Sequence, residues 1–244
     1  MKLATTLLAV ALLSGCAAPA KRENLPAVHF RDDRGALDIL IQRADLVKTV
    51  SSQGTITLTR PSGESVRLDL AMVRSGRDKL RLRAWKLGRA VFDLTMNGGD
   101  VWLFTPDDQS LKQKARSAGL SARQLAQNIR LLDGELFRRP DATITHADGD
   151  MLSVTAAEGD KSMICDIDRR TLTPRKYVLT DPNGVARFAL ELSDYQAGML
   201  VPVPFRMTAR SDDGTIAVAL RDVEINGELA EGAFIPPKRA EKLP

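Results

Sequence analysis

The spacing of apolar residues changes along this chain from a helical period to a strand period. From Asp33 to Val47 the apolar residues recur every three or four positions, and Asp32 or Asp33 stands where an N-cap is expected. Beyond Val47 the period falls to two, which is typical of strands with one apolar and one solvated face. The pattern predicts one amphipathic helix followed by antiparallel strands.

About a dozen later segments carry this strand signal. Turn residues separate them, as in Asn97-Gly98-Gly99-Asp100, where Asn-Gly supplies the positive φ angles of a tight hairpin. The chain has no βαβ rhythm and no internal repeat, so the predicted fold is mainly β, a strongly curved antiparallel sheet or barrel. The segments lie at 56–58, 66–72, 80–83, 92–97, 101–105, 152–154, 163–167, 177–180, 188–192, 205–207 and 216–220.

A second helical stripe interrupts the strands. Ser121 is a suitable N-cap, and the apolar residues that follow lie on one face of the predicted helix. Such a stripe either packs on the core or covers a pocket as a lid. Its members are Leu125, Ile129, Leu132 and Leu136.

The amino-terminal segment has the features of an export signal. Lys2 precedes an apolar run that is too short to cross a bilayer as a helix and that closes on Leu13-Ser14-Gly15-Cys16. This ending resembles the bacterial lipobox, which implies cleavage between Gly15 and Cys16, diacylglycerol on the Cys16 sulfur and acylation of the new amino terminus. The alternative is an ordinary signal peptide that happens to contain a cysteine.

These features divide the chain into four predicted parts. Residues 1–15 are the signal peptide, 16–31 the lipidated terminus and tether, 32–237 a single domain, and 238–244 a tail. Ala17 follows the lipidated cysteine in place of the aspartate that resembles an inner-membrane retention signal. We therefore expect a lipid anchor at the periplasmic face of the outer membrane.

Composition and charge narrow the possible functions. Apolar residues make up 43% of the chain, enough for a large aliphatic core. The net charge of +4 arises from 35 basic residues scattered among 31 acidic ones, without a basic stripe, so nucleic acid is not an expected partner. Cys165 has no cysteine partner once Cys16 is lipidated, so we expect no disulfide. A monomer is expected.

The sequence also lacks the groups of an enzyme or a metal site. The two histidines, His29 and His146, are isolated, and the spacing gives neither a triad nor a zinc motif. Cys165 shares an alternating face with Met163 and Ile167, which favours a buried, inert thiol over a reactive one. We expect no catalysis, no cofactor and no metal.

The order of these elements resembles the LolA/LolB superfamily of lipoprotein carriers and acceptors. The resemblance covers nearly all of 33–237 and includes the ending Val223-Glu224-Ile225-Asn226-Gly227-Glu228-Leu229 and Phe234-Ile235-Pro236-Pro237. It implies an incomplete β-barrel whose concave apolar face, covered by amphipathic helices, accommodates acyl chains. The lipobox is similar to that of anchored members. No position matches the carriers' key arginine or the membrane-inserting loop leucine of the acceptors.

The resulting hypothesis is a membrane-anchored protein that binds acyl chains or lipid-modified proteins, in lipoprotein or lipid trafficking. A sensor or scaffold that holds a protein partner is the alternative, and it predicts a closed, filled barrel. The apolar loop 197–205 either contacts a bilayer or an acylated partner, or caps the core. The candidate cavity-lining residues are Leu68, Leu70, Leu82, Phe92, Leu94, Met96, Trp102, Phe188 and Leu190.

Overall fold

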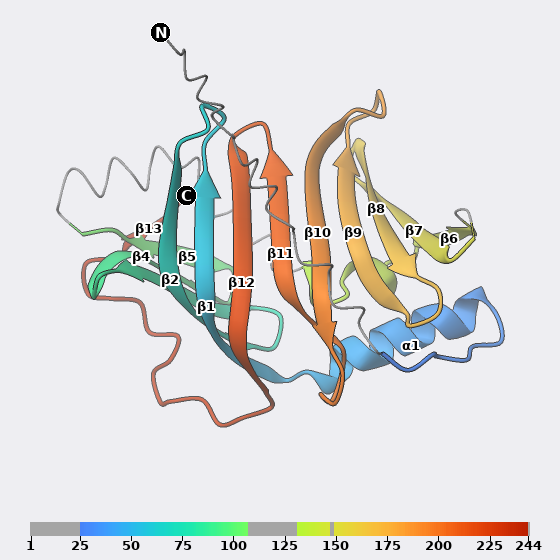
Figure 1. Cartoon of the computed structure of the whole chain (residues 1–244), viewed down its shortest axis with the longest axis horizontal. Helices are drawn as coiled ribbons and strands as arrows, with labels where there is room; N and C mark the ends of the chain where they lie inside the picture. Colours follow the sequence, from blue (N-terminus) through green and yellow to red (C-terminus); the bar gives the residue numbers. More distant parts are fainter. Residues whose placement is uncertain (1–24, 107–130, 147–148, 244) are drawn as a thin grey trace, which may run out of the picture.

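A single antiparallel sheet forms most of the computed structural model, which describes residues 25–106, 131–146 and 149–243 (Figure 1). The helices with defined bounds in this part of the chain are the α-helix α1 (Asp33–Leu46) and the 3₁₀ helix η1 (Leu136–Arg138), and residue 131 is also helical. The strands are β1 (Thr49–Thr59), β2 (Ser65–Ser75), β3 (Lys79–Lys86), β4 (Arg89–Asn97), β5 (Asp100–Phe104), β6 (Thr143–His146), β7 (Met151–Glu158), β8 (Lys161–Asp168), β9 (Thr173–Thr180), β10 (Ala186–Gln196), β11 (Val203–Ser211), β12 (Gly214–Ile225) and β13 (Glu241–Lys242).

The strand order shows two meanders joined in the middle of the sheet. It runs β13-β5-β4-β3-β2-β1-β12-β11-β10-β9-β8-β7-β6, so β1 and β12 are the two strands that connect the halves. The sheet is strongly curved and does not close on itself (Figure 1). The predicted fold class is therefore confirmed.

The first predicted helix is confirmed together with its cap. Asp32 has an extended backbone, and its carboxylate accepts a hydrogen bond from the Gly35 amide at 2.8 Å. This bond satisfies one of the donors that a helix leaves free at its first turn. α1 lies across one end of the sheet near β9 and β10 (Figure 1).

Alternating residues of the strands build two apolar clusters. In β1 and β2, for example, Ile56, Leu58, Leu68 and Leu70 are buried while the residues between them are more exposed. One cluster covers β1 to β5, and the other lies between α1 and β7 to β11. Met207 and Ile216 pack against both clusters, which makes the core continuous across the junction of the meanders.

Both ends of the domain extend beyond the predicted boundaries. Leu25 is buried in the second cluster, and the Val28 amide donates to the Arg170 carbonyl at 2.7 Å, so the end of the predicted tether packs on the sheet. The predicted tail contains β13, which pairs with β5. Strand signals of two to four residues, as in β6 and β13, are too short to recognise by periodicity.

The segment after β12 crosses the outer face of the first meander to reach β13. Arg81 of β3 donates to the carbonyl of Ala233 in this segment at 3.2 Å and also pairs with the Asp93 carboxylate at 2.9 Å. Asp93 and Thr95 are consequently buried on the outer face of β4 while Leu94 and Met96 are buried on its inner face. Coverage on both sides explains why β4 shows a continuous buried run.

Candidate functional site

The structure places the predicted cavity-lining residues in the packed core. Six belong to the first cluster: Leu68, Leu70, Leu82, Phe92, Leu94 and Met96. Phe188 and Leu190 are buried in the second cluster. Trp102 is half-buried, and the Lys242 ammonium lies 5.9 Å from the centre of its ring. Alternation identified their buried face, but no member of this set is among the described residues that line the cavity below.

An apolar cavity of about 140 Å³ lies between α1 and the middle of the sheet. Leu40 and Ala44 of α1 form one wall, and side chains of β1, β2 and β9 to β12 form the floor. The connection between β10 and β11 closes one side with Val201, Pro202 and the first residues of β11. The residues of the predicted apolar loop 197–205 thus have different surroundings. Val201 is buried at the cavity, Met199 packs on the core, and Leu200 is 56% exposed.

Two arginines border this otherwise apolar space. Arg43 of α1 donates from one guanidinium nitrogen to the carbonyls of Thr171 and Leu172, at 2.9 and 2.8 Å, and thereby ties the helix to the turn before β9. Burial lowers the pKa of Arg43. Arg74 of β2 forms an ion pair with Asp133, and burial lowers the pKa of Arg74 to about 10. Arg74 therefore remains a cation at neutral pH.

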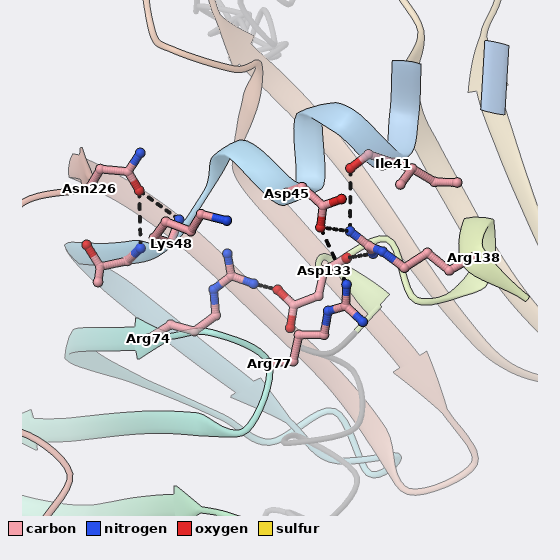
Figure 2. Close-up of polar contacts among 9 residues, drawn as sticks. Ile41, Asp45, Lys48, Arg74, Arg77, Asp133, Arg138 and Asn226 are labelled. Atoms are coloured by element: carbon pink, nitrogen blue, oxygen red, sulfur yellow. Dashed lines mark hydrogen bonds and ion pairs between the residues drawn. The ribbon is translucent and has the colours of Figure 1, made fainter. Parts of the chain in front are cut away.

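The Arg74–Asp133 pair belongs to a network that joins β2, α1 and residues 131–138 (Figure 2). Arg138 donates to the main-chain oxygen of Asp133 at 2.6 Å, to the Asp45 carboxylate at 2.6 Å and to the Ile41 carbonyl at 3.4 Å. The hydrogen bond from Arg138 is the main cause of the lowered pKa of Asp45. The network holds residues 131–138 against the open side of the cavity.

A glycine allows this segment to approach α1. Gly134 has φ of +66°, and a Cβ atom there would lie 3.0 Å from the Cβ of Ala44. Both the left-handed backbone and the close contact therefore favour glycine at this position. Leu132 and Phe137, on either side of Gly134, line the cavity with apolar side chains.

The second predicted helix does not continue through its whole stripe. Helical structure is described at residue 131, but Leu132 lies in a turn and Leu136 is the first residue of η1. Gly134 and the Arg138 contacts explain the break, because the chain turns there to follow α1. Leu132 lines the cavity, Leu136 is buried in the second core cluster, and Leu125 and Ile129 lie outside the described residues.

Cys165 belongs to β8 of the same sheet, and its side chain is fully buried. Burial raises the pKa of its thiol well above the ordinary value, so the sulfur stays protonated at neutral pH. The predicted face of Met163, Cys165 and Ile167 is buried. Within 25–106, 131–146 and 149–243, no group of His, Cys, Asp or Glu residues is arranged to hold a metal ion. No helix in those ranges is long and apolar enough to cross a membrane.

An exposed leucine marks the tip of the β3–β4 hairpin. Lys86 pairs with Arg89, so Leu87 and Gly88 form a two-residue loop in which both residues have positive φ angles, 50° and 75°. Such loops prefer Asn-Gly, and a leucine with positive φ is uncommon. The Leu87 side chain is 92% exposed. Sequence reasoning assigned no role to Leu87, although an apolar residue beside a glycine between two strand signals is itself unusual.

Comparisons with known proteins assign the fold. No family model and no curated protein sequence matches this chain. Solved structures do match. A LolA superfamily protein of Nitrosomonas europaea has a TM-score of 0.56 at 12% identity, over 82% of this chain and 97% of the other.

Two further structures agree. An outer membrane lipoprotein-sorting protein domain of Vibrio parahaemolyticus has a TM-score of 0.55 at 14% identity, over 82% of this chain and 95% of its own. A DUF1329 family protein of Desulfovibrio piger has a TM-score of 0.57 at 12% identity, over 82% and 96%. The chain has the LolA-like fold, an unclosed curved sheet, and the resemblance seen in the sequence is confirmed at the level of the fold.

The buried ion pair at the cavity makes a testable contribution to stability. The side chains of Arg74 and Asp133 are 12% and 5% exposed. Arg74→Met keeps an apolar stem but leaves the Asp133 charge buried without its partner. We expect the free energy of unfolding in urea to fall by about 3–5 kcal/mol.

The control is the double variant Arg74→Met, Asp133→Leu, which removes both charges. It should recover most of the loss, because a buried pair is often replaceable by apolar residues. A single variant as stable as the wild type would contradict a structural role for the pair.

Proposed function

We propose that this protein is a lipid-anchored protein of the bacterial envelope that binds acyl chains, as free lipids or on lipid-modified proteins, in the cavity beneath α1. The observation that carries the proposal is an apolar cavity enclosed by α1, residues 132–137 and the concave side of a LolA-like sheet. Each methylene transferred into such a site contributes about 0.8 kcal/mol. The cavity and the unclosed sheet favour this function over a scaffold with a filled barrel.

The size of the cavity indicates that binding involves opening. Its volume of about 140 Å³ is smaller than the roughly 300–1,000 Å³ of ordinary ligand pockets. The wall formed by residues 132–137 is held by the contacts of Arg74 and Arg138, whereas the floor is part of the sheet. Admission of a whole acyl chain therefore requires α1 and residues 131–138 to separate from the sheet while the strands stay in place.

A bulky side chain in the cavity provides the test. Val203 of β11 lines the cavity and is only partly buried, so Val203→Trp should fill space with little disturbance of the sheet. We expect the uptake of a fluorescent palmitoyl probe by the purified protein to fall at least ten-fold.

Arg206→Trp is the matched control, because Arg206 lies on the same strand with an exposed side chain outside the cavity. It should bind the probe like the wild type. Equal binding by wild type and Val203→Trp would place the acyl site elsewhere and count against the proposal.

We assign a membrane contact to Leu87 within this function. The exposed leucine is flanked by Lys86 and Arg89, whose charges favour an anionic lipid surface. The positive φ angle of Leu87 is unfavourable for leucine, which supports a role for its side chain other than stabilising the hairpin.

Leu87→Asn separates the two roles, because asparagine suits the turn but cannot insert into lipid. Burial of a leucine is worth about 1.5–3 kcal/mol, so we expect the loop–lipid contact to weaken ten-fold or more. The measurement is quenching of tryptophan fluorescence by brominated phospholipids in vesicles that carry the mature protein. Ile235→Asn, at another exposed apolar position, should leave the quenching unchanged. Quenching in Leu87→Asn equal to that of the wild type would contradict the proposed contact of Leu87 with the membrane.

The anchor itself depends on one sulfur atom. We propose that Cys16 carries diacylglycerol and holds the protein at the outer membrane, with the segment from Cys16 to Leu25 able to reach at most about 30 Å. Cys16→Ser should abolish the incorporation of labelled fatty acid in growing cells, because the hydroxyl does not accept the lipid.

Cys165→Ala serves as the control and should be labelled like the wild type, since its thiol is buried. Labelling of Cys16→Ser at the wild-type level would refute the lipid anchor but not the cavity.

A further inference from the structure

A second and larger cavity adjoins the first. Its volume is about 590 Å³, and it lies between β1, β2, β12 and the connection from β10 to β11. Met72 of β2 lines both cavities. Residues close together in β1 and β12 line different cavities. Val50 and Leu220 line the first cavity, whereas Ser52 and Arg221 line the second.

The two cavities differ in chemistry. The first is almost entirely apolar apart from the guanidinium groups of Arg43 and Arg74 at its border. The second combines apolar side chains such as Phe205 with polar ones such as Gln196, and exposed charged residues of β12 line it as well. A ligand that spans both cavities would place an apolar part in one and a polar part in the other.

Ser52 is the unusual residue of the second cavity. It is 6% exposed on the buried face of β1, a face otherwise occupied by Val50, Ile56 and Leu58. Its Oγ atom has no hydrogen-bond partner in the part of the chain that the structure describes, and it is shielded from the cavity. Rotation about the Cα–Cβ bond is needed to present the hydroxyl to a ligand. The residues directly opposite are Met72 and Val223, whose side chains accept no strong hydrogen bond.

An unpaired buried hydroxyl lowers stability, and nearly all such groups in proteins have a partner. Alanine would fit the same space without this loss. The Ser52 hydroxyl is therefore a donor that an acceptor atom of a ligand could satisfy.

We propose that the second cavity binds the ester-linked head of an acylated ligand, with Ser52 Oγ–H donating to an ester carbonyl while the acyl chain passes Met72 into the first cavity. This inference rests on the proposed acyl-binding function. It adds that the protein recognises an ester group next to the acyl chain of the ligand. Met72 suits the boundary, because an unbranched thioether side chain adapts its shape at small cost. Ester carbonyls occur in diacylglyceryl-modified cysteine and in phospholipid.

The test compares ester and ether probes on the mature, lipid-anchored protein in nanodiscs of diether phospholipid. The ester carbonyls present besides those of the probe are then those of the Cys16 anchor, which the wild type and the variants share. The probes are a fluorescent dipalmitoylglyceryl lipopeptide, its dialkyl ether analogue and dipalmitoyl phosphatidylglycerol. Ser52→Ala should weaken binding of an ester probe by about 2- to 12-fold, the value of one hydrogen bond, and leave the ether probe unchanged. The ester probe that loses affinity identifies the ligand source.

Two controls separate ligand recognition from packing. Ser193→Ala, at an exposed position of β10 that lines neither cavity, should change the binding of neither probe. Ser52→Ala should also unfold in urea with a free energy equal to or above the wild-type value. Equal effects on ester and ether probes, or none on either, would overturn the Ser52 contact. Failure of every probe to bind the wild type would instead refute the proposed function.

Discussion

Strands β1 and β12 pair antiparallel in the middle of the sheet and are the contact through which the two meanders become one structure. The pairing shifts register between Gln53 and Gly54, where β12 contributes an additional residue. A Cβ atom at Gly54 would lie 2.2 Å from the Ala219 carbonyl oxygen, so the close approach of the strands requires glycine. Bulges of this kind bend a sheet. Residues at this bulge line both cavities: Leu220 lines the first, and Gln53 and Arg221 line the second.

Curvature creates a concave apolar surface, and among the residues that the structure describes α1 covers part of it. On the first half of this surface, buried side chains of β1 to β5 form the first core cluster. Toward the second half, α1 and residues 131–138 approach the sheet without filling the space between them. The cavity therefore occupies the boundary between the two core clusters, where Met207 both packs and lines the wall.

Charged contacts hold residues 131–138 against α1 and β2, whereas backbone hydrogen bonds and apolar packing hold the sheet. Arg74, Arg138 and Asp45 join three elements through directional contacts that are broken by displacements of a few ångströms (Figure 2). The floor strands are connected by continuous backbone ladders and lose stability only when many bonds break together.

The sequence determined the elements whose signal is local. The alternation of apolar residues defined eleven strands of the sheet, the Asp32 cap placed the start of α1, and the face shared by Met163, Cys165 and Ile167 correctly indicated a buried thiol. The order of elements, with the closing segment after Val223, was sufficient for the LolA-like fold. Such features depend on neighbouring residues and on burial, which a single sequence records directly.

Only the tertiary structure decided which buried residues face empty space. Leu94 and Leu192 carry the same strand signal, but Leu94 meets other side chains and Leu192 meets a cavity. The difference depends on how closely α1 approaches each strand, and thus on long-range contacts such as Arg74–Asp133 and the close contact of Gly134 with Ala44. The same reason applies to Ser52, which lies outside the predicted strand segment 56–58. Only the register of β1 with β2 and β12 shows that it is buried and that its hydroxyl has no partner among the described residues.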